Sequence, residues 1–172
     1  ILFSRPIDKF FSSVIVFTLF ITTVLSCQNR NETQFSLEAL NDKLINLQGD
    51  SVSFKFILEK HKGSAVFVDV WASWCKDCLK GLPGVKKLQE THQKIDFVFL
   101  SLDKSQVAWK KGIDRLKISG EHYFMQSGWK GALGTFLGLD WIPRYLIIDK
   151  YGGIKVFNAI ETTDKKLLNN LK

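Results

Sequence analysis

The sequence predicts an α/β fold in which a central β-sheet is flanked by helices. Two apolar runs, Ala65–Val70 and Ile95–Ser101, have the length and composition of buried strands. The segment between them, from Cys75 to about His92, follows a helical pattern and contains Pro83. Two parallel strands joined by a helix make a βαβ unit, with functional side chains at the carboxyl end of the first strand. The residues that follow Val70 are therefore the first candidates for a functional site.

Shorter elements are expected on both sides of this unit. Tyr145–Ile148 and Ile154–Phe157 are strands separated by turn residues 149–153, so they predict an antiparallel hairpin that makes the sheet mixed. The other expected elements are a helical stretch and a β-turn at Gln48–Asp50 within 35–62, a short strand at Val52–Phe54, helical turns at Lys55–His61, an amphipathic helix at Gln106–Lys117, a short edge strand at Glu121–Phe124, a glycine-rich loop with a short helix at Gln126–Leu139 and a closing helix at Thr163–Leu171.

Length and composition fit one globular domain preceded by a targeting segment. The chain has 172 residues, of which 45% are hydrophobic and 24% charged. Its formal net charge is +7, but the lysines are scattered through the helices instead of gathering with aromatic residues, which disfavours nucleic-acid binding. The histidines show no ligand spacing, and no second Cys-x-x-Cys completes a zinc site. We therefore expect no metal and no cofactor.

Residues 1–26 are expected to be an export signal. Arg5 and Lys9 precede a nearly uncharged apolar run from Phe10 to Leu25, which is short for a membrane-spanning helix but suits a signal peptide. The run ends in Val24-Leu25-Ser26-Cys27, which resembles a bacterial lipoprotein box with lipid attachment at Cys27. An uncleaved membrane anchor and a plain secretory signal are the alternatives. Residues 27–34 would then be a polar tether, and 35–172 the folded domain, outside the cytoplasm in the periplasm or outer envelope.

Cys75 and Cys78 are the central feature of the chain. They lie three residues apart at the start of the predicted helix, so they share a face and can close a short disulfide. Helix-terminal cysteines of this spacing have thiol pKa values lowered from ~8.5 to about 3.5–7.5. Cys75 is expected to be exposed and nucleophilic. Half a zinc site, an inert disulfide and buried thiols are the alternatives.

The residues around this pair carry a family resemblance. Trp71-Ala72-Ser73-Trp74-Cys75-Lys76-Asp77-Cys78 follows a strand and precedes a helix containing Pro83, and it resembles the active site of the thioredoxin superfamily, most closely its extracytoplasmic TlpA/ResA-type branch. The resemblance implies a thioredoxin-like fold with an N-terminal hairpin extension and covers roughly residues 35–172. Trp71 and Trp74 would frame the site, with core packing alone as the alternative for Trp71. Lys76 and Asp77 replace the usual Gly-Pro, the first favouring the Cys75 thiolate and the second opposing it.

Two further positions match the family. Asp69, a carboxyl group among apolar strand residues, is expected to have a raised pKa and to accept the proton of Cys78, unless it is partly exposed at a strand end. Pro143 matches the family's cis-proline, beside which the backbone of Ile142 would pair with an extended substrate; a trans proline is the alternative. Arg144 departs from the common Thr and places a cation near the site, where it would favour the Cys75 thiolate or contact an acidic partner.

The resemblance implies thiol–disulfide exchange on proteins. The most direct interpretation is a monomeric reductant supplied by a membrane thiol electron donor, with cytochrome c maturation as its setting. The alternatives are a disulfide oxidant or isomerase, a thiol-dependent peroxidase or antioxidant protein of the same fold, and a lipid-anchored binding module without catalysis. Glu121-His122-Tyr123 suggests acid–base chemistry, but a lone histidine in a strand is far more often a packing residue.

Overall fold

The computed structural model describes residues 32–171. Their elements are, in chain order, α2 (Leu37–Asn41), β1 (Lys43–Ile45), β2 (Ser51–Ser53), α3 (Phe54–Lys60), β3 (Ala65–Trp71), α4 (Lys76–Thr91), β4 (Ile95–Ser101), α5 (Gln106–Leu116), β5 (Glu121–Phe124), the 3-10 helix η1 (Gly128–Lys130), α6 (Ala132–Phe136), β6 (Arg144–Ile148), β7 (Ile154–Ala159) and α7 (Lys165–Asn169). The expected signal segment, residues 1–26, and Cys27 lie outside the described residues. From residue 32 to 171, no helix has the length and apolar character that crossing a membrane requires.

The strands form one seven-stranded mixed sheet in the order β2-β1-β5-β4-β3-β6-β7. β3 pairs in parallel with β4 and antiparallel with β6, with Val68 opposite both Val98 and Leu146. Residues 66–71 of β3 are all buried, which explains why this strand is a nearly continuous apolar run instead of an alternating one. The βαβ unit and the mixed sheet expected from the sequence are both confirmed.

The prediction that residues 121–124 form an edge strand was wrong. β5 pairs in parallel with β4, and Phe124 also pairs with Ile45 of β1 on the other side. The hairpin of β1 and β2 therefore continues the sheet beyond β5. A pattern of four residues identifies a strand, but it carries no information about a partner that is distant in the sequence.

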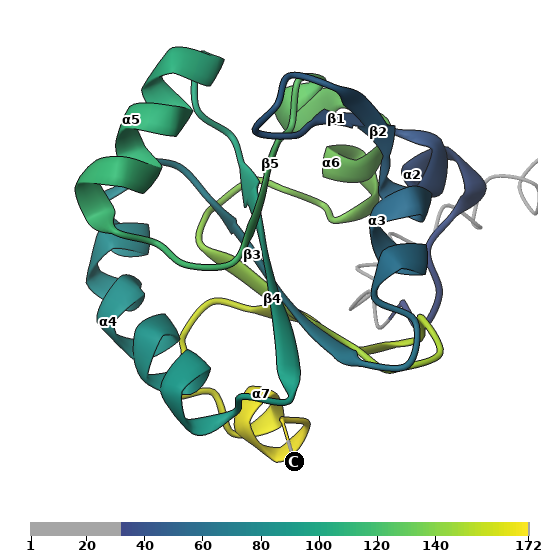
Figure 1. Ribbon diagram of the computed structural model, residues 1–172. Helices are drawn as coiled ribbons and strands as arrows, with labels where there is room; N and C mark the ends of the chain where they lie inside the picture. Colours follow the sequence, from purple (N-terminus) through teal and green to yellow (C-terminus); the bar gives the residue numbers. More distant parts are fainter. Residues whose placement is uncertain (1–31, 172) are drawn as a thin grey trace, which may run out of the picture. The chain divides into compact units, whose positions relative to one another are not determined.

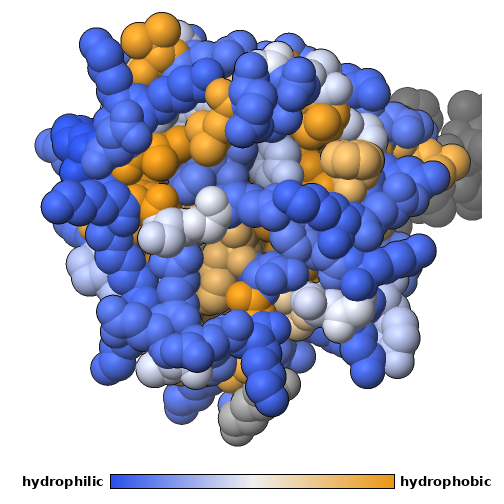
Figure 2. Space-filling view, viewed as in Figure 1, coloured by the Kyte–Doolittle hydropathy of each residue, from blue (hydrophilic) through white to orange (hydrophobic). Residues whose placement is uncertain are grey.

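Helices cover both faces of the sheet (Figure 1). α4 and α5 lie on one side, and α2, α3 and α6 lie on the other. Serine side chains fix the start of three of these helices. Ser36 accepts a hydrogen bond from the backbone N–H of Ala39, Ser53 accepts one from that of Phe56, and Ser105 accepts one from that of Ala108. The face drawn in Figure 2 is mostly hydrophilic, and its apolar side chains form separate patches.

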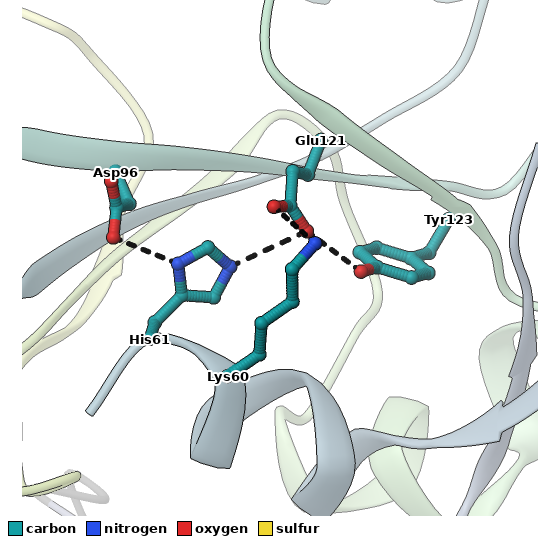
Figure 3. A network of polar contacts seen from close by, with 5 residues as sticks. All are labelled: Lys60, His61, Asp96, Glu121 and Tyr123. Atoms are coloured by element: carbon teal, nitrogen blue, oxygen red, sulfur yellow. Dashed lines mark hydrogen bonds and ion pairs between the residues drawn. The ribbon is translucent and has the colours of Figure 1, made fainter.

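A buried histidine joins α3 to the amino ends of two strands (Figure 3). Nδ1 of His61 lies 2.8 Å from a carboxylate oxygen of Asp96, and Nε2 lies 3.5 Å from one of Glu121. Glu121 also accepts hydrogen bonds from Nζ of Lys60 at 2.6 Å and from the hydroxyl of Tyr123 at 2.8 Å. Asp96 is the second residue of β4 and Glu121 is the first of β5, so this network fastens the end of the sheet that lies away from the carboxyl end of β3.

The first described residues already contact the sheet. The backbone N–H of Ile154 donates a hydrogen bond to the carbonyl of Thr33 at 2.9 Å. Ile154 begins β7 and pairs with Ile148, the last residue of β6. Thr33 was expected to belong to a polar tether, but here its backbone lies against the edge strand.

Candidate active site

Cys75 and Cys78 form a disulfide at the start of α4, with 5.3 Å between their Cα atoms. Cys75 is the residue that caps the helix, and its Sγ accepts a hydrogen bond from the backbone N–H of Cys78 at 3.1 Å. The free N–H groups and the dipole of a helix start stabilise a thiolate once such a disulfide is reduced. The pair therefore has the position and spacing of a reversible thiol–disulfide couple.

Both cysteines are shielded from solvent. Each is 6% exposed, so the expectation of an exposed Cys75 was wrong. Sγ of Cys75 lies 3.5 Å from the carbonyl oxygen of Ile142, which belongs to a loop distant in the sequence. The helical pattern located Cys75 at the helix start, but it could not indicate that a remote loop covers it.

That loop contains a cis peptide bond between Ile142 and Pro143. The cis isomer is the one that the family resemblance implied. β6 begins at the next residue, Arg144, which lies opposite Val70 of β3. The pairing of β6 with β3 therefore brings the proline loop and the cysteines to the same end of the sheet.

Asp69 is a buried carboxyl group in the middle of the sheet. It lies opposite Phe99 of β4 and Tyr145 of β6, and its Oδ1 has no hydrogen-bond partner among the described residues. Burial raises the pKa of Asp69 to about 8, because an unpartnered carboxylate is costly in an apolar environment. The prediction of a buried acid is confirmed, and a partly exposed one is excluded. The group can hold a proton near neutral pH.

A groove of about 550 Å³ lies beside Cys75. Its aromatic walls are Trp74, Trp129 of η1 and Trp141. Trp74 frames the site as expected, whereas Trp71 belongs to the core. The remaining lining residues are Lys76, Asp77, Lys80, Asp140 and Ile142. From residue 32 to 171, no three side chains of His, Cys, Asp or Glu gather in a metal-binding arrangement.

A thioredoxin-like family model matches residues 63–154, which include β3, the disulfide and the proline loop. The chain belongs to the thioredoxin-like family. The thiol-disulfide oxidoreductase ResA of Bacillus thuringiensis (strain Al Hakam) is 26% identical over 146 residues, which cover 84% of this chain and 80% of ResA. The thioredoxin-like protein YneN of Bacillus subtilis (strain 168) is 34% identical over 138 residues, covering 78% of this chain and 76% of YneN.

A solved structure agrees with this assignment. The thioredoxin domain of a thiol-disulfide oxidoreductase from Bacteroides vulgatus superposes with a TM-score of 0.61 at 24% identity, over 79% of this chain and 95% of that domain, and it supports the fold. Fold and relatives together make the chain a thioredoxin-like thiol–disulfide oxidoreductase of the ResA type.

Sequence reasoning missed one carboxylate at this thioredoxin-like site. Asp103 is buried just after β4, and it accepts hydrogen bonds from the backbone N–H of Ser73 at 3.1 Å, from the Ser73 hydroxyl at 2.7 Å and from the Ser101 hydroxyl at 2.8 Å. Arg115 of α5 donates to the carbonyl of Ser73 at 3.0 Å. These contacts fix the loop two residues before Cys75. An Asp at the carboxyl end of the strand beside β3 was the signal that could have identified it.

Arg144 is buried, and its guanidinium faces its own loop. It donates a hydrogen bond to the carbonyl of Leu137 at 2.9 Å and lies 3.5 Å from the carboxylate of Asp140. Burial lowers the pKa of Arg144, while the nearby Asp140 opposes that shift. The observed contacts support the loop that carries Trp141, and a contact between Arg144 and a partner stays a prediction.

His122 is a packing residue at a distance from the cysteines. Its ring stacks on Phe99 with 4.9 Å between centroids, and its Nε2 lies 3.1 Å from the carbonyl oxygen of Ile118. Burial lowers the pKa of His122, despite that hydrogen bond. The acid–base interpretation of residues 121–123 is therefore not supported, and packing is the role that the contacts describe.

Proposed function

We propose that this chain reduces disulfide bonds in partner proteins through Cys75 and Cys78. The observation that carries the proposal is the Cys75–Cys78 disulfide at the start of α4, 3.5 Å from the loop that contains the cis proline. A dithiol at this position supplies two electrons, and the backbone beside Pro143 can hold an extended segment against it. Ile142, Pro143 and Trp74 are the proposed substrate-binding residues.

The first step joins the two proteins. The thiolate of Cys75 attacks one sulfur of the partner disulfide, forming a new S–S bond to that sulfur and breaking the partner's own bond. The other partner sulfur leaves as a thiolate and takes a proton. Lys76 favours the attacking thiolate, because its ammonium group follows Cys75 directly and no ion-pair partner for it exists among residues 32–171.

The second step releases the reduced partner. Cys78 loses its proton and attacks Sγ of Cys75, so the Cys75–Cys78 bond forms, the mixed disulfide breaks and the partner leaves with its second thiol. We assign Asp69 the role of accepting the proton of Cys78, because its raised pKa matches that of a thiol better than an ordinary carboxylate would. The partner gains two electrons, and the pair loses two.

Insulin reduction tests this assignment. Cys75→Ser should abolish turnover, and Cys78→Ser should accumulate the mixed disulfide, which non-reducing electrophoresis detects. Cys27→Ser, which removes the cysteine outside the motif, is the matched control and should retain turnover. Asp69→Asn should slow the second step and change its pH profile. Turnover by Cys75→Ser would contradict the proposal.

The direction of electron flow is the second question, because one contact favours an oxidant. Asp77 is engaged by Nζ of Lys80 at 3.1 Å, which leaves Lys76 less opposed beside Cys75. A more stable thiolate makes a disulfide more oxidising. The reduction potential decides between the two. A value near −270 mV, as in thioredoxin, fits a reductant, and one near about −120 mV fits an oxidant.

We further propose that the protein acts outside the cytoplasm, attached to a membrane through lipid on Cys27. The signal-like residues 1–26 and the cysteine that follows them support this proposal. A membrane thiol donor would then restore the dithiol, and the haem-attachment cysteines of cytochrome c are the proposed substrates. Incorporation of labelled palmitate that disappears in Cys27→Ala would support the anchor, and unlabelled protein in the membrane fraction would contradict it.

A further inference from the structure

We propose that the tryptophan groove beside Cys75 selects partner segments in which aromatic side chains flank the reacting cysteine. The tryptophan groove is the hollow lined by Trp74, Trp129 and Trp141. This inference rests on the proposed function, because the groove is where a partner reaches Cys75. Its occupant is an extended polypeptide segment of another protein.

The tryptophans come from three separate parts of the chain. Trp74 directly precedes Cys75, Trp129 lies in η1, and Trp141 lies two residues before the cis proline. Trp74 is 50% exposed and Trp141 is 57% exposed, whereas the fold buries Trp71 and Trp109 almost completely. Tryptophans that leave this much apolar surface in water contribute little to folding, and they are typical of binding hot spots.

Hydrogen bonds fix the chain next to two of these tryptophans before a partner arrives. Arg144 donates to the carbonyl of Leu137 and contacts Asp140, which precedes Trp141 directly. Asp103 binds the backbone and hydroxyl of Ser73, which precedes Trp74. A groove fixed in this way loses little conformational freedom on binding. The free energy of the aromatic contacts is therefore offset less and contributes more to affinity.

Trp141 lines two hollows. The second, of about 380 Å³, shares Asp77, Lys80 and Trp141 with the first and also has Pro143, Ile160 and Glu161 in its lining. Because Trp141 lines both, a segment that runs past the cis proline crosses this indole and places one side chain on each side of it. Offset or edge-to-face contact with an indole favours aromatic side chains over small ones.

The charges around the groove also restrict the occupant. Asp77 is paired with Lys80, and Asp140 lies near Arg144. Lys76 has no ion-pair partner among residues 32–171, so the uncompensated charge beside Cys75 is positive. A partner segment that combines aromatic residues with an acidic one therefore fits better than a basic segment.

The test uses two synthetic peptides that differ only beside their cysteine, with Phe on both sides in one and Gly in the other. Each is supplied as the mixed disulfide with the same small thiol, and kcat/KM for its reduction by the full-length chain is measured. We expect kcat/KM for the Phe peptide to be about ten times that for the Gly peptide, because one aromatic contact provides about this factor. Trp141→Ala should bring the ratio of the two values close to one.

Tyr151→Ala is the matched control, because Tyr151 is exposed but lies outside the tryptophan groove. It should keep the tenfold ratio. Equal rates for the two peptides with the unchanged chain, or a full ratio in Trp141→Ala, would overturn the inference.

A binding measurement separates this inference from the proposed function. Peptides with Ser in place of Cys cannot react, so quenching of tryptophan fluorescence reports their binding alone. Tighter binding of the Phe version, without reduction of either disulfide, would support the groove and refute the reductase. Reduction of both peptides with equal binding would support the reductase and refute the groove.

Discussion

Replacing Asp69 with Asn should change how the stability of the protein depends on pH. Asp69 is buried, its Oδ1 has no hydrogen-bond partner among the described residues, and its pKa is raised from 3.8 to about 8. Asn has nearly the same size and cannot ionise. The variant therefore removes the cost of burying a charge and keeps the packing of β3 against β4 and β6.

The size of the effect follows from the shift. Because the pKa of Asp69 is higher in the folded chain, the folded state holds the proton more tightly. This proton contributes fully to the free energy of unfolding below pH 3.8. Its contribution is lost as pH rises from 3.8 toward 8. From pH 3.8 to 7 is about three units, so about 4 kcal/mol is lost at ~1.4 kcal/mol per unit. Asp69→Asn should therefore be more stable than the unchanged chain by about this amount at pH 7.

Urea unfolding of the oxidised proteins between pH 5 and 8 measures this difference. The free energy of unfolding of the unchanged chain should fall more steeply with pH than that of Asp69→Asn, by about 1.4 kcal/mol per unit. Tyr145→Phe is a suitable control, because it lies beside Asp69 and keeps the carboxyl group. Equal pH slopes for Asp69→Asn and the unchanged chain would refute the reasoning.

Three further substitutions test the supports of the site and of the sheet. Asp103→Ala leaves two hydroxyls and one N–H without their acceptor, and it should lower the free energy of unfolding by about 2–4 kcal/mol in urea titrations; a loss below about 1 kcal/mol would contradict this. Gly112→Ala places a Cβ against that of Ser73, so it should lower the free energy of unfolding by about 1–3 kcal/mol and slow insulin reduction. Unchanged values of both would count against the close packing of α5. His61→Ala breaks the contact with Asp96 and should lower the free energy of unfolding by about 1–3 kcal/mol. The control Lys55→Ala, at an exposed ion pair, should lower it by less than about 0.5 kcal/mol. Equal losses would show that the network of Figure 3 is not stabilising.

The sequence was informative where one short segment determines the structure. The strand at residues 65–71, the helix that follows Cys75 and the strand at 95–101 agree with their predicted ranges, because each has a clear apolar or helical period. The Cys75–Cys78 pair was predictable for the same reason. Two cysteines three residues apart at a helix start lie on the same face, where their sulfur atoms are close enough to form a disulfide.

Features that depend on distant segments were not predictable in this way. The shielding of Cys75 comes from residue 142, and the position of β5 inside the sheet comes from a contact with Ile45. Asp103 was missed because its partners Ser73 and Ser101 converge on it only after β3 and β4 have paired. Local patterns identify elements, and tertiary pairing decides which side chains meet.

The hydrogen bond between Ile154 and Thr33 determines where the chain enters the domain. Ile154 lies opposite Ile148, and Ile148 lies opposite Val66 at the start of β3, so Thr33 and the disulfide are at opposite poles of the sheet. Six residues from Cys27 to Thr33 extend at most about 20 Å. If lipid on Cys27 holds the protein as proposed, this short linker keeps the domain close to the bilayer. The disulfide then lies at the end of the sheet farther from the attachment point, so the proposed membrane thiol donor must reach it through a part that extends out of the bilayer.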